Sequence, residues 1–102
     1  MSLPEPVRTA IHHALQSLRD KDPITPVDTH RVEHEMIKNH AAAFGDGLVH
    51  FTDGFEYPLQ EFSRRIGLYL LDHCSESVVK VDTVVSQNLA GQPSQNALWQ
   101  FV

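Results

Sequence analysis

The sequence predicts an α+β fold in which helices pack on one face of a small antiparallel sheet. Three segments place apolar residues at helical spacing, and two segments near the C-terminus are rich in β-branched or aromatic residues. The 102 residues suffice for one modest core, so we expect a single α+β domain over residues 1–102. The predicted order is a two-helix hairpin, a β-hairpin, a central helix and C-terminal β-strands.

The first predicted helix runs from about Pro4–Pro6 to about Arg19. Ser2 and Glu5 have the spacing of a capping box at its start. A charged run followed by a proline then ends the helix. Its apolar stripe, which has helical periodicity, consists of Val7, Ile11, Ala14, Leu15 and Leu18.

The second predicted helix begins at Thr25 and Pro26 and extends to Phe44. Thr25 can cap the helix, Pro26 fits its first position, and Gly45 provides a left-handed stop. Because the connection to the first helix is short, we expect the two helices to lie side by side and antiparallel. The predicted buried face consists of Val32, Met36, His40 and Ala43.

A β-hairpin is predicted over residues 48–57. Two β-type segments, 48–52 and 55–57, flank Asp53-Gly54, the pair favoured in a type I′ turn. A two-residue loop of this kind would place His50 opposite Tyr57 on one face of the hairpin.

The central helix is predicted over Pro58–Cys74, the most apolar window of the chain. Pro58 suits the first helical turn, where its missing N–H costs nothing. Gly67 is unfavourable in the middle of a helix, which predicts that another backbone packs close to it. The apolar stripe consists of Leu59, Phe62, Ile66, Leu70 and Cys74.

Two strands are predicted after the central helix. Residues 78–86 are dense in β-branched residues and predict the first strand. Residues 88–96 are turn-rich and predict a loop, and residues 97–102 predict the final strand. A helix that would end at Gly91 stays open as the alternative, because four apolar residues also have helical spacing: Val78, Val81, Val85 and Leu89.

The composition argues against several classes of protein. A net charge of −5 with eight Lys and Arg residues makes nucleic acid an unlikely partner, since a general nucleic-acid binder needs a basic face. The longest apolar run, Leu68–Leu71, is too short to span a bilayer, and the N-terminus lacks the apolar core of a secretory signal. The single Cys74 predicts a buried, reduced thiol. We therefore expect a cytoplasmic protein with no membrane attachment.

Histidine is unusually frequent, with seven residues. His30 and His34 lie one turn apart on the second predicted helix, beside Glu33, and two imidazoles at this spacing can chelate a transition metal. The third ligand would come from elsewhere: Asp28, His50 or His73. Because zinc sites use three or four ligands and the HExxH motif is absent, two exposed helix histidines are the favoured interpretation. No cofactor is expected.

Aromatic residues point to an interaction surface instead. The predicted hairpin and tail carry five of them, more than a small core readily covers: Phe51, Phe55, Tyr57, Trp99 and Phe101. The alternative is that these rings complete the core between sheet and helices.

The favoured functional hypothesis is a non-enzymatic protein-interaction or regulatory module. It would bind a protein partner or pair with itself as a homodimer. The first alternative is a small metal- or ligand-binding protein, or an enzyme, that uses His30 and His34. The second is a nucleic-acid-associated regulator. No catalytic motif is found in the sequence, which disfavours an enzyme.

Overall fold

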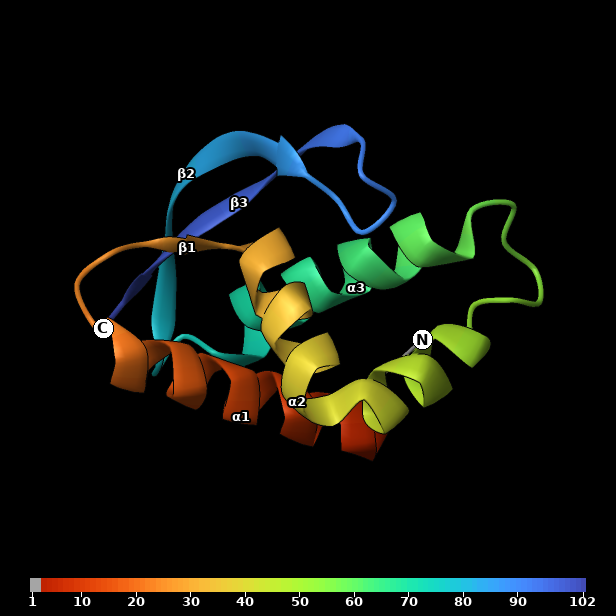
Figure 1. The fold of residues 1–102 in the computed structure, drawn as a ribbon, viewed down its shortest axis with the longest axis horizontal. Helices are drawn as coiled ribbons and strands as arrows, with labels where there is room; N and C mark the ends of the chain where they lie inside the picture. Colours follow the sequence, from red (N-terminus) through yellow and green to blue (C-terminus); the bar gives the residue numbers. More distant parts are fainter. Residues whose placement is uncertain (1–2) are drawn as a thin grey trace.

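The computed structural model describes residues 3–102, which form three helices on one side of a three-stranded antiparallel sheet (Figure 1). The predicted α+β class is therefore confirmed. Ser2, the predicted capping partner of Glu5, lies outside the described residues. The elements are α1 (Glu5–Lys21), β1 (Val27–Asp28), α2 (Thr29–Val49), α3 (Pro58–His73), β2 (Val78–Gln87) and β3 (Pro93–Phe101).

The sheet has the strand order β1–β3–β2, so β3 lies in the middle and the ten-residue β2 forms one edge. Both pairings are antiparallel, with Val27 opposite Trp99 and Val78 opposite Phe101. The register of β2 against β3 shifts between Lys80 and Asp82. The residue between them therefore has no partner in β3, which makes a β-bulge in the edge strand.

The two predicted C-terminal strands are confirmed, and the helical alternative for residues 78–89 is wrong. The turn between the strands is built by Asn88, whose side chain accepts hydrogen bonds from the N–H groups of Ala90 and Gln92. Gly91 has a φ of 78°, so it shapes this turn and does not end a helix. The second strand starts earlier than predicted, at Pro93, because proline is tolerated at the first position of a strand.

The core lies between the helices and the sheet. α1 buries its predicted apolar stripe, and α3 confirms the predicted central helix, ending at His73 just before the buried Cys74. Trp99 and Phe101 of β3 close the core from the side of the sheet. The fully buried side chains of α3 are Phe62, Ile66 and Leu70.

The predicted bounds of the second helix are wrong at both ends. Its N-terminus is capped by Asp28, whose carboxylate accepts a hydrogen bond from the Arg31 N–H at 2.8 Å, because the preceding residues pair with β3 instead of starting the helix. The helix continues past Gly45 to Val49 and has a kink at His40, where φ is −141° and ψ is 45°. Gly47 is buried and Leu48 half-buried, so packing of the last helical turn outweighs the tendency of Gly45 to end a helix.

Gly47 marks the point where α2 packs most closely against α1 and α3. A Cβ atom at this position would lie 2.5 Å from Cγ2 of Val7 and 2.7 Å from Cζ of Phe62. α1 and α3 therefore both approach α2 at the glycine, and this contact is possible only where a side chain is absent.

The predicted β-hairpin at residues 48–57 is wrong. Residues 48 and 49 belong to α2, and residues 50–57 form turns without strand pairing. The Phe51 ring is fully buried, and its centroid lies 5.6 Å from that of Phe55 and 5.4 Å from that of Phe62. The aromatic residues that predicted a strand here are therefore buried by tertiary packing and not by pairing in a sheet. Gly54 keeps the positive φ expected of a turn, at 87°.

The predicted close backbone contact at Gly67 is also wrong. A Cβ atom at this position would have the Thr29 side chain as its nearest neighbour, at 3.9 Å, and no other backbone within 4 Å. Gly67 therefore leaves open space beside α3.

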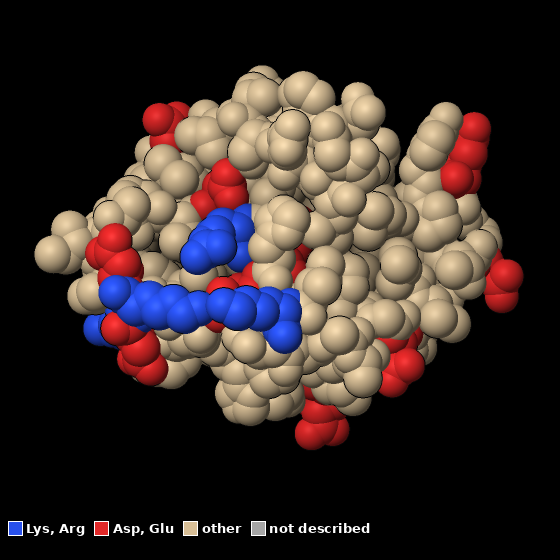
Figure 2. All heavy atoms as spheres, in the orientation of Figure 1, with Lys and Arg blue, Asp and Glu red and all other residues tan. Residues whose placement is uncertain are grey.

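The surface agrees with the acidic composition. On the face shown in Figure 2, the basic side chains form a band from one end of the molecule to about its middle, with acidic side chains beside it, and the rest of this face has acidic side chains only among uncharged residues. Within residues 3–102, none of the helices combines the length and the apolar character needed to cross a lipid bilayer.

Candidate functional site

A cleft of about 820 Å³ lies between the start of α2, one face of α3 and the β2–β3 hairpin, whose turn stands beside α3 in Figure 1. This volume is within the range of about 300–1,000 Å³ that is typical of small-molecule sites. We call it the Glu33 cleft. Its lining includes Thr29, His30 and Glu33 from α2, Ser63, Gly67, Leu68 and Leu71 from α3, and Lys80, Leu89 and Asn96 from the hairpin.

The most unusual group in this lining is the Glu33 carboxyl. Only 1% of the residue is exposed, and neither carboxyl oxygen has a hydrogen-bond partner. Among residues 3–102, these two oxygens are the only buried side-chain polar atoms in that condition. A buried polar group without a partner costs stability and is rare in folded proteins, so it marks a candidate functional group.

The surroundings of Glu33 favour its neutral form. Burial raises the pKa of the carboxyl to about 7. The Ser63 hydroxyl lies near the carboxyl, without the geometry of a hydrogen bond to it, and opposes this rise, whereas the Asp28 carboxylate adds to it. Near neutral pH the carboxyl is therefore present in both its protonated and its ionised form. A group poised in this way can accept a cation, exchange a proton or form a strong hydrogen bond.

The wall formed by α2 is fixed to the sheet by hydrogen bonds of Thr29 and His30. The Trp99 indole N–H donates to Oγ1 of Thr29 at 2.9 Å, and the His30 backbone N–H donates to Oδ1 of Asn96 at 2.9 Å. Nδ1 of His30 lies 2.8 Å from Oγ of Ser86. Because these contacts join the start of α2 to both long strands, the cleft is formed before any ligand arrives.

His30 is 3% exposed, and burial lowers the pKa of its imidazole. The nearby Asp28 carboxylate opposes this shift, and His34 adds to it. Burial thus favours the uncharged imidazole. His30 contributes a polar side chain to the lining of the cleft, held in place by Ser86.

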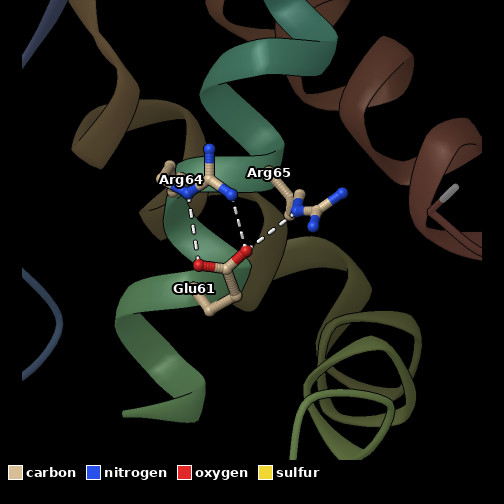
Figure 3. Close-up of polar contacts among 3 residues, drawn as sticks. All are labelled: Glu61, Arg64 and Arg65. Carbon is tan, nitrogen blue, oxygen red and sulfur yellow. Dashed lines mark hydrogen bonds and ion pairs between the residues drawn. The ribbon is translucent and has the colours of Figure 1, made fainter. Parts of the chain in front are cut away.

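At the rim, Arg64 is held by an acid of its own helix. Its Nη2 and Nε donate to Oε1 and Oε2 of Glu61 at 2.8 and 3.2 Å, and Arg65 also donates to Oε1, as Figure 3 shows. The two guanidinium groups hold the pKa of the Glu61 carboxyl at about 2. Arg64 therefore neutralises Glu61 and makes no hydrogen bond with Glu33.

The predicted histidine pair is divided between two environments. His30 lines the cleft, whereas His34 is exposed. His73, one of the possible third ligands, stacks on Tyr69 with ring centroids 5.0 Å apart. In the part of the chain that the structure describes, no three His, Cys, Asp or Glu side chains gather in a way that would hold a metal ion.

The predicted aromatic surface is divided as well. The rings of Phe51, Trp99 and Phe101 lie in the core, and Phe55 is partly buried against it. Tyr57 is 60% exposed and stands at the cleft. Most of these rings thus complete the core.

Glu33 was predicted only as a neighbour of the histidines. Its local sequence has no signal that separates it from Glu35, because each glutamate lies beside a residue predicted to be buried, Val32 or Met36. No protein-family model matches the sequence, and the searches of curated proteins and of solved structures found no match.

Proposed function

We propose that this protein binds a small organic molecule in the Glu33 cleft and that the Glu33 carboxyl anchors the ligand's polar end. One observation carries the proposal: a carboxyl that is 1% exposed and has no hydrogen-bond partner lines a cleft of about 820 Å³. A ligand would supply the partner that the protein itself does not supply.

The energetic cost of Glu33 supports this proposal. A rise in pKa from 4.5 to about 7 corresponds to about 3 kcal/mol of destabilisation when the carboxyl is ionised. That is a substantial fraction of the roughly 5–15 kcal/mol by which whole domains are stable. A ligand that donates hydrogen bonds to the carboxyl would offset part of this cost. An apolar residue at this position could not bind a ligand in this way.

The rest of the lining is suited to an amphipathic molecule. α3 contributes Leu59, Leu68 and Leu71, and the hairpin turn contributes Leu89. Leu68 and Leu71 remain 40% and 52% exposed, so an apolar ligand body would cover surface that now faces water.

The test is an NMR fragment screen with a variant that fills the cleft. In Gly67→Leu, the new Cβ meets only the Thr29 side chain, at 3.9 Å, and the rest of the leucine takes up cleft volume. Leucine also has the higher helix propensity, by up to about 1 kcal/mol, so the variant should fold. We expect fragments that shift amide resonances of cleft residues in the wild type to lose this effect in Gly67→Leu.

Gly45→Leu is the matched control, because it makes the same change in a helix at a position with open space around it and outside the cleft. It should bind the same fragments as the wild type. Fragments that bind Gly67→Leu as well as they bind Gly45→Leu would overturn the proposal, as would a diverse screen that perturbs no cleft residue.

A second candidate is the protein-interaction module that the sequence predicts. Tyr57, Leu68 and Leu71 are exposed together at the mouth of the cleft, and a protein partner or a second copy of this chain would bury them. Light scattering coupled to size-exclusion chromatography tests the homodimer. A dimer that Leu71→Ser converts to a monomer would support this candidate, and a monomer at high protein concentration would exclude self-association.

A further inference from the structure

We propose that the ligand of the Glu33 cleft is a protonated primary amine on an apolar body, with its ammonium group bound to the Glu33 carboxylate. This inference rests on the proposed function, since it names the chemical class of the molecule that the same cleft binds. The free carboxyl oxygens, the charges around them and the apolar walls each contribute one step.

The two carboxyl oxygens of Glu33 require hydrogen-bond donors from the ligand. An ionised carboxylate only accepts hydrogen bonds, and both oxygens of Glu33 are without a donor. A suitable ligand must therefore bring N–H or O–H groups, and an ammonium group brings three in a compact volume. Each of these oxygens exposes less than 1 Å² to solvent, so an ammonium group reaches them only when the side chains around Glu33 shift.

The charged groups near Glu33 favour a cationic ligand. No lysine or arginine is among the groups that shift the pKa of Glu33, and the one charged residue among them, Asp28, is also acidic. A ligand cation thus meets a carboxylate that has no competing cation, whereas an anionic ligand would be repelled. A charged hydrogen-bonded pair is also stronger than a neutral one.

The other titratable groups of the lining do not alter this conclusion. On α2, burial favours the neutral form of His30. On α3, Arg64 is paired with Glu61. Glu56 and Tyr57 from the segment before α3, and Lys80 from β2, are exposed. None of these residues makes a hydrogen bond with the Glu33 carboxyl.

The apolar part of the cleft favours a hydrocarbon body on the ligand. An ammonium group fills only a small part of about 820 Å³, and the leucines of α3 and of the hairpin turn line part of the remainder, beside polar side chains such as Gln60, Gln92 and Gln95. Hydrocarbon attached to the amine would cover these side chains, and burial of apolar surface adds affinity. The polar and apolar parts of the cleft thus select an amphipathic amine.

Amine binding to Glu33 must also be linked to protons. The free protein carries a proton on Glu33 below pH 7, and this proton must leave before the carboxylate can bind an ammonium group. Affinity should therefore rise about tenfold between pH 6 and pH 8, because the fraction of ionised Glu33 rises by about that factor. A ligand that uses no ionised carboxyl would show no such rise.

The experiment compares 2-phenylethylamine with 2-phenylethanol, which has the same skeleton and no charge, by NMR titration. Wild type, Glu33→Gln and Gly67→Leu are titrated in parallel at pH 6 and pH 8. In the wild type at pH 8, we expect the amine to bind at least tenfold more tightly than the alcohol. Glu33→Gln should remove this preference and the pH dependence, and Gly67→Leu should abolish binding of both probes.

The outcomes separate this inference from the proposed function. If both probes bind the wild type equally and Gly67→Leu abolishes both, the ligand is not a cation but the cleft still binds small molecules. The same conclusion follows if neither probe binds while other fragments shift cleft resonances. If no probe or fragment perturbs the cleft, both proposals fail.

Discussion

Glu33 and Glu35 lie two residues apart on α2 and are each 1% exposed, yet their surroundings are opposite. Oε1 of Glu35 accepts hydrogen bonds from Ser17 and Lys21 at 2.8 Å and from Asn39 at 2.9 Å. Neither oxygen of Glu33 has a hydrogen-bond partner. Two residues correspond to about 200° around a helix, so one carboxyl faces α1 and the other faces the cleft.

The comparison separates a buried acid that has partners in the protein from one that has none. Lys21 and Ser17 lower the pKa of Glu35, so the fold favours its ionised form and Glu35 helps to hold α1 against α2. Burial raises the pKa of Glu33, so the fold disfavours its ionised form. Burial alone therefore does not decide the charge state of a glutamate, because the partners available within the protein decide which form is favoured.

The largest expected effect is the pH dependence of stability that Glu33 causes. Its pKa is raised from 4.5 to about 7, so below pH 4.5 the residue carries no penalty. Between these values the folded state holds a proton that the unfolded state has lost, and stability falls as pH rises, by about 3 kcal/mol in total. We expect Glu33→Gln to remove this loss and to be the more stable protein at pH 8, as measured by urea unfolding from pH 4 to pH 8.

Glu35→Gln is the matched control for that experiment, because it should leave the fall in stability between pH 4.5 and pH 7 in place. Identical pH profiles for the wild type and Glu33→Gln would show that Glu33 is not held in a raised-pKa environment.

The second prediction concerns the partnered acid. Glu35→Ala removes three hydrogen bonds, two of them from α1 and one from Asn39 of α2, and should lower the free energy of unfolding at pH 7 by about 2 kcal/mol. Because the pKa of Glu35 is lowered from 4.5, its contribution is present above pH 4.5 and is lost as pH falls below that value. The difference between wild type and variant should therefore shrink in acid. A constant difference would contradict this assignment.

The third prediction uses the glycine at the packed side of α2. Gly47→Ala places a Cβ atom within 2.7 Å of both Val7 and Phe62 and should destabilise the protein by about 1–2 kcal/mol, despite alanine's better helix propensity. Thermal unfolding measures this effect. An unchanged or higher melting temperature would show that α1 and α3 do not approach α2 closely at this point.

The smallest effect is expected at the glycine of the cleft. Gly67→Ala meets only the Thr29 side chain, at 3.9 Å, so the gain in helix propensity should stabilise the protein by about 0.5–1 kcal/mol. The same unfolding assay measures it. Destabilisation would indicate that the cleft is closed around Gly67 in solution.

The sequence predicted the elements whose signals are local. The stripe of α1, the length of α3 and the β-branched run of β2 follow from periodicity and composition, and the structure confirms them. The predicted hairpin failed because Phe51 is buried by contact with α3, which a local pattern does not encode. The start of α2 was misplaced because Val27 and Asp28 pair with a strand some 70 residues later.

The candidate site could not be predicted for the same reason. Glu33 and Glu35 stand in one short polar run, Glu33-His34-Glu35, and their local sequence gives no reason to treat them differently. The partners of Glu35 come mainly from α1, at Ser17 and Lys21, whereas the cleft beside Glu33 is formed by α3 and the β2–β3 hairpin. Only the packing of distant segments decides which carboxyl is satisfied.

The bulge in β2 has a consequence for the protein's behaviour at high concentration. β2 is a ten-residue edge strand, and its Val79, Val81 and Val85 are exposed, a combination that serves as a template for amyloid-like growth. The irregularity between Lys80 and Asp82 interrupts this template in its first half, beside a charged side chain on either side. An incoming strand therefore cannot pair with this edge along its full length, so the bulge disfavours edge-to-edge association through β2.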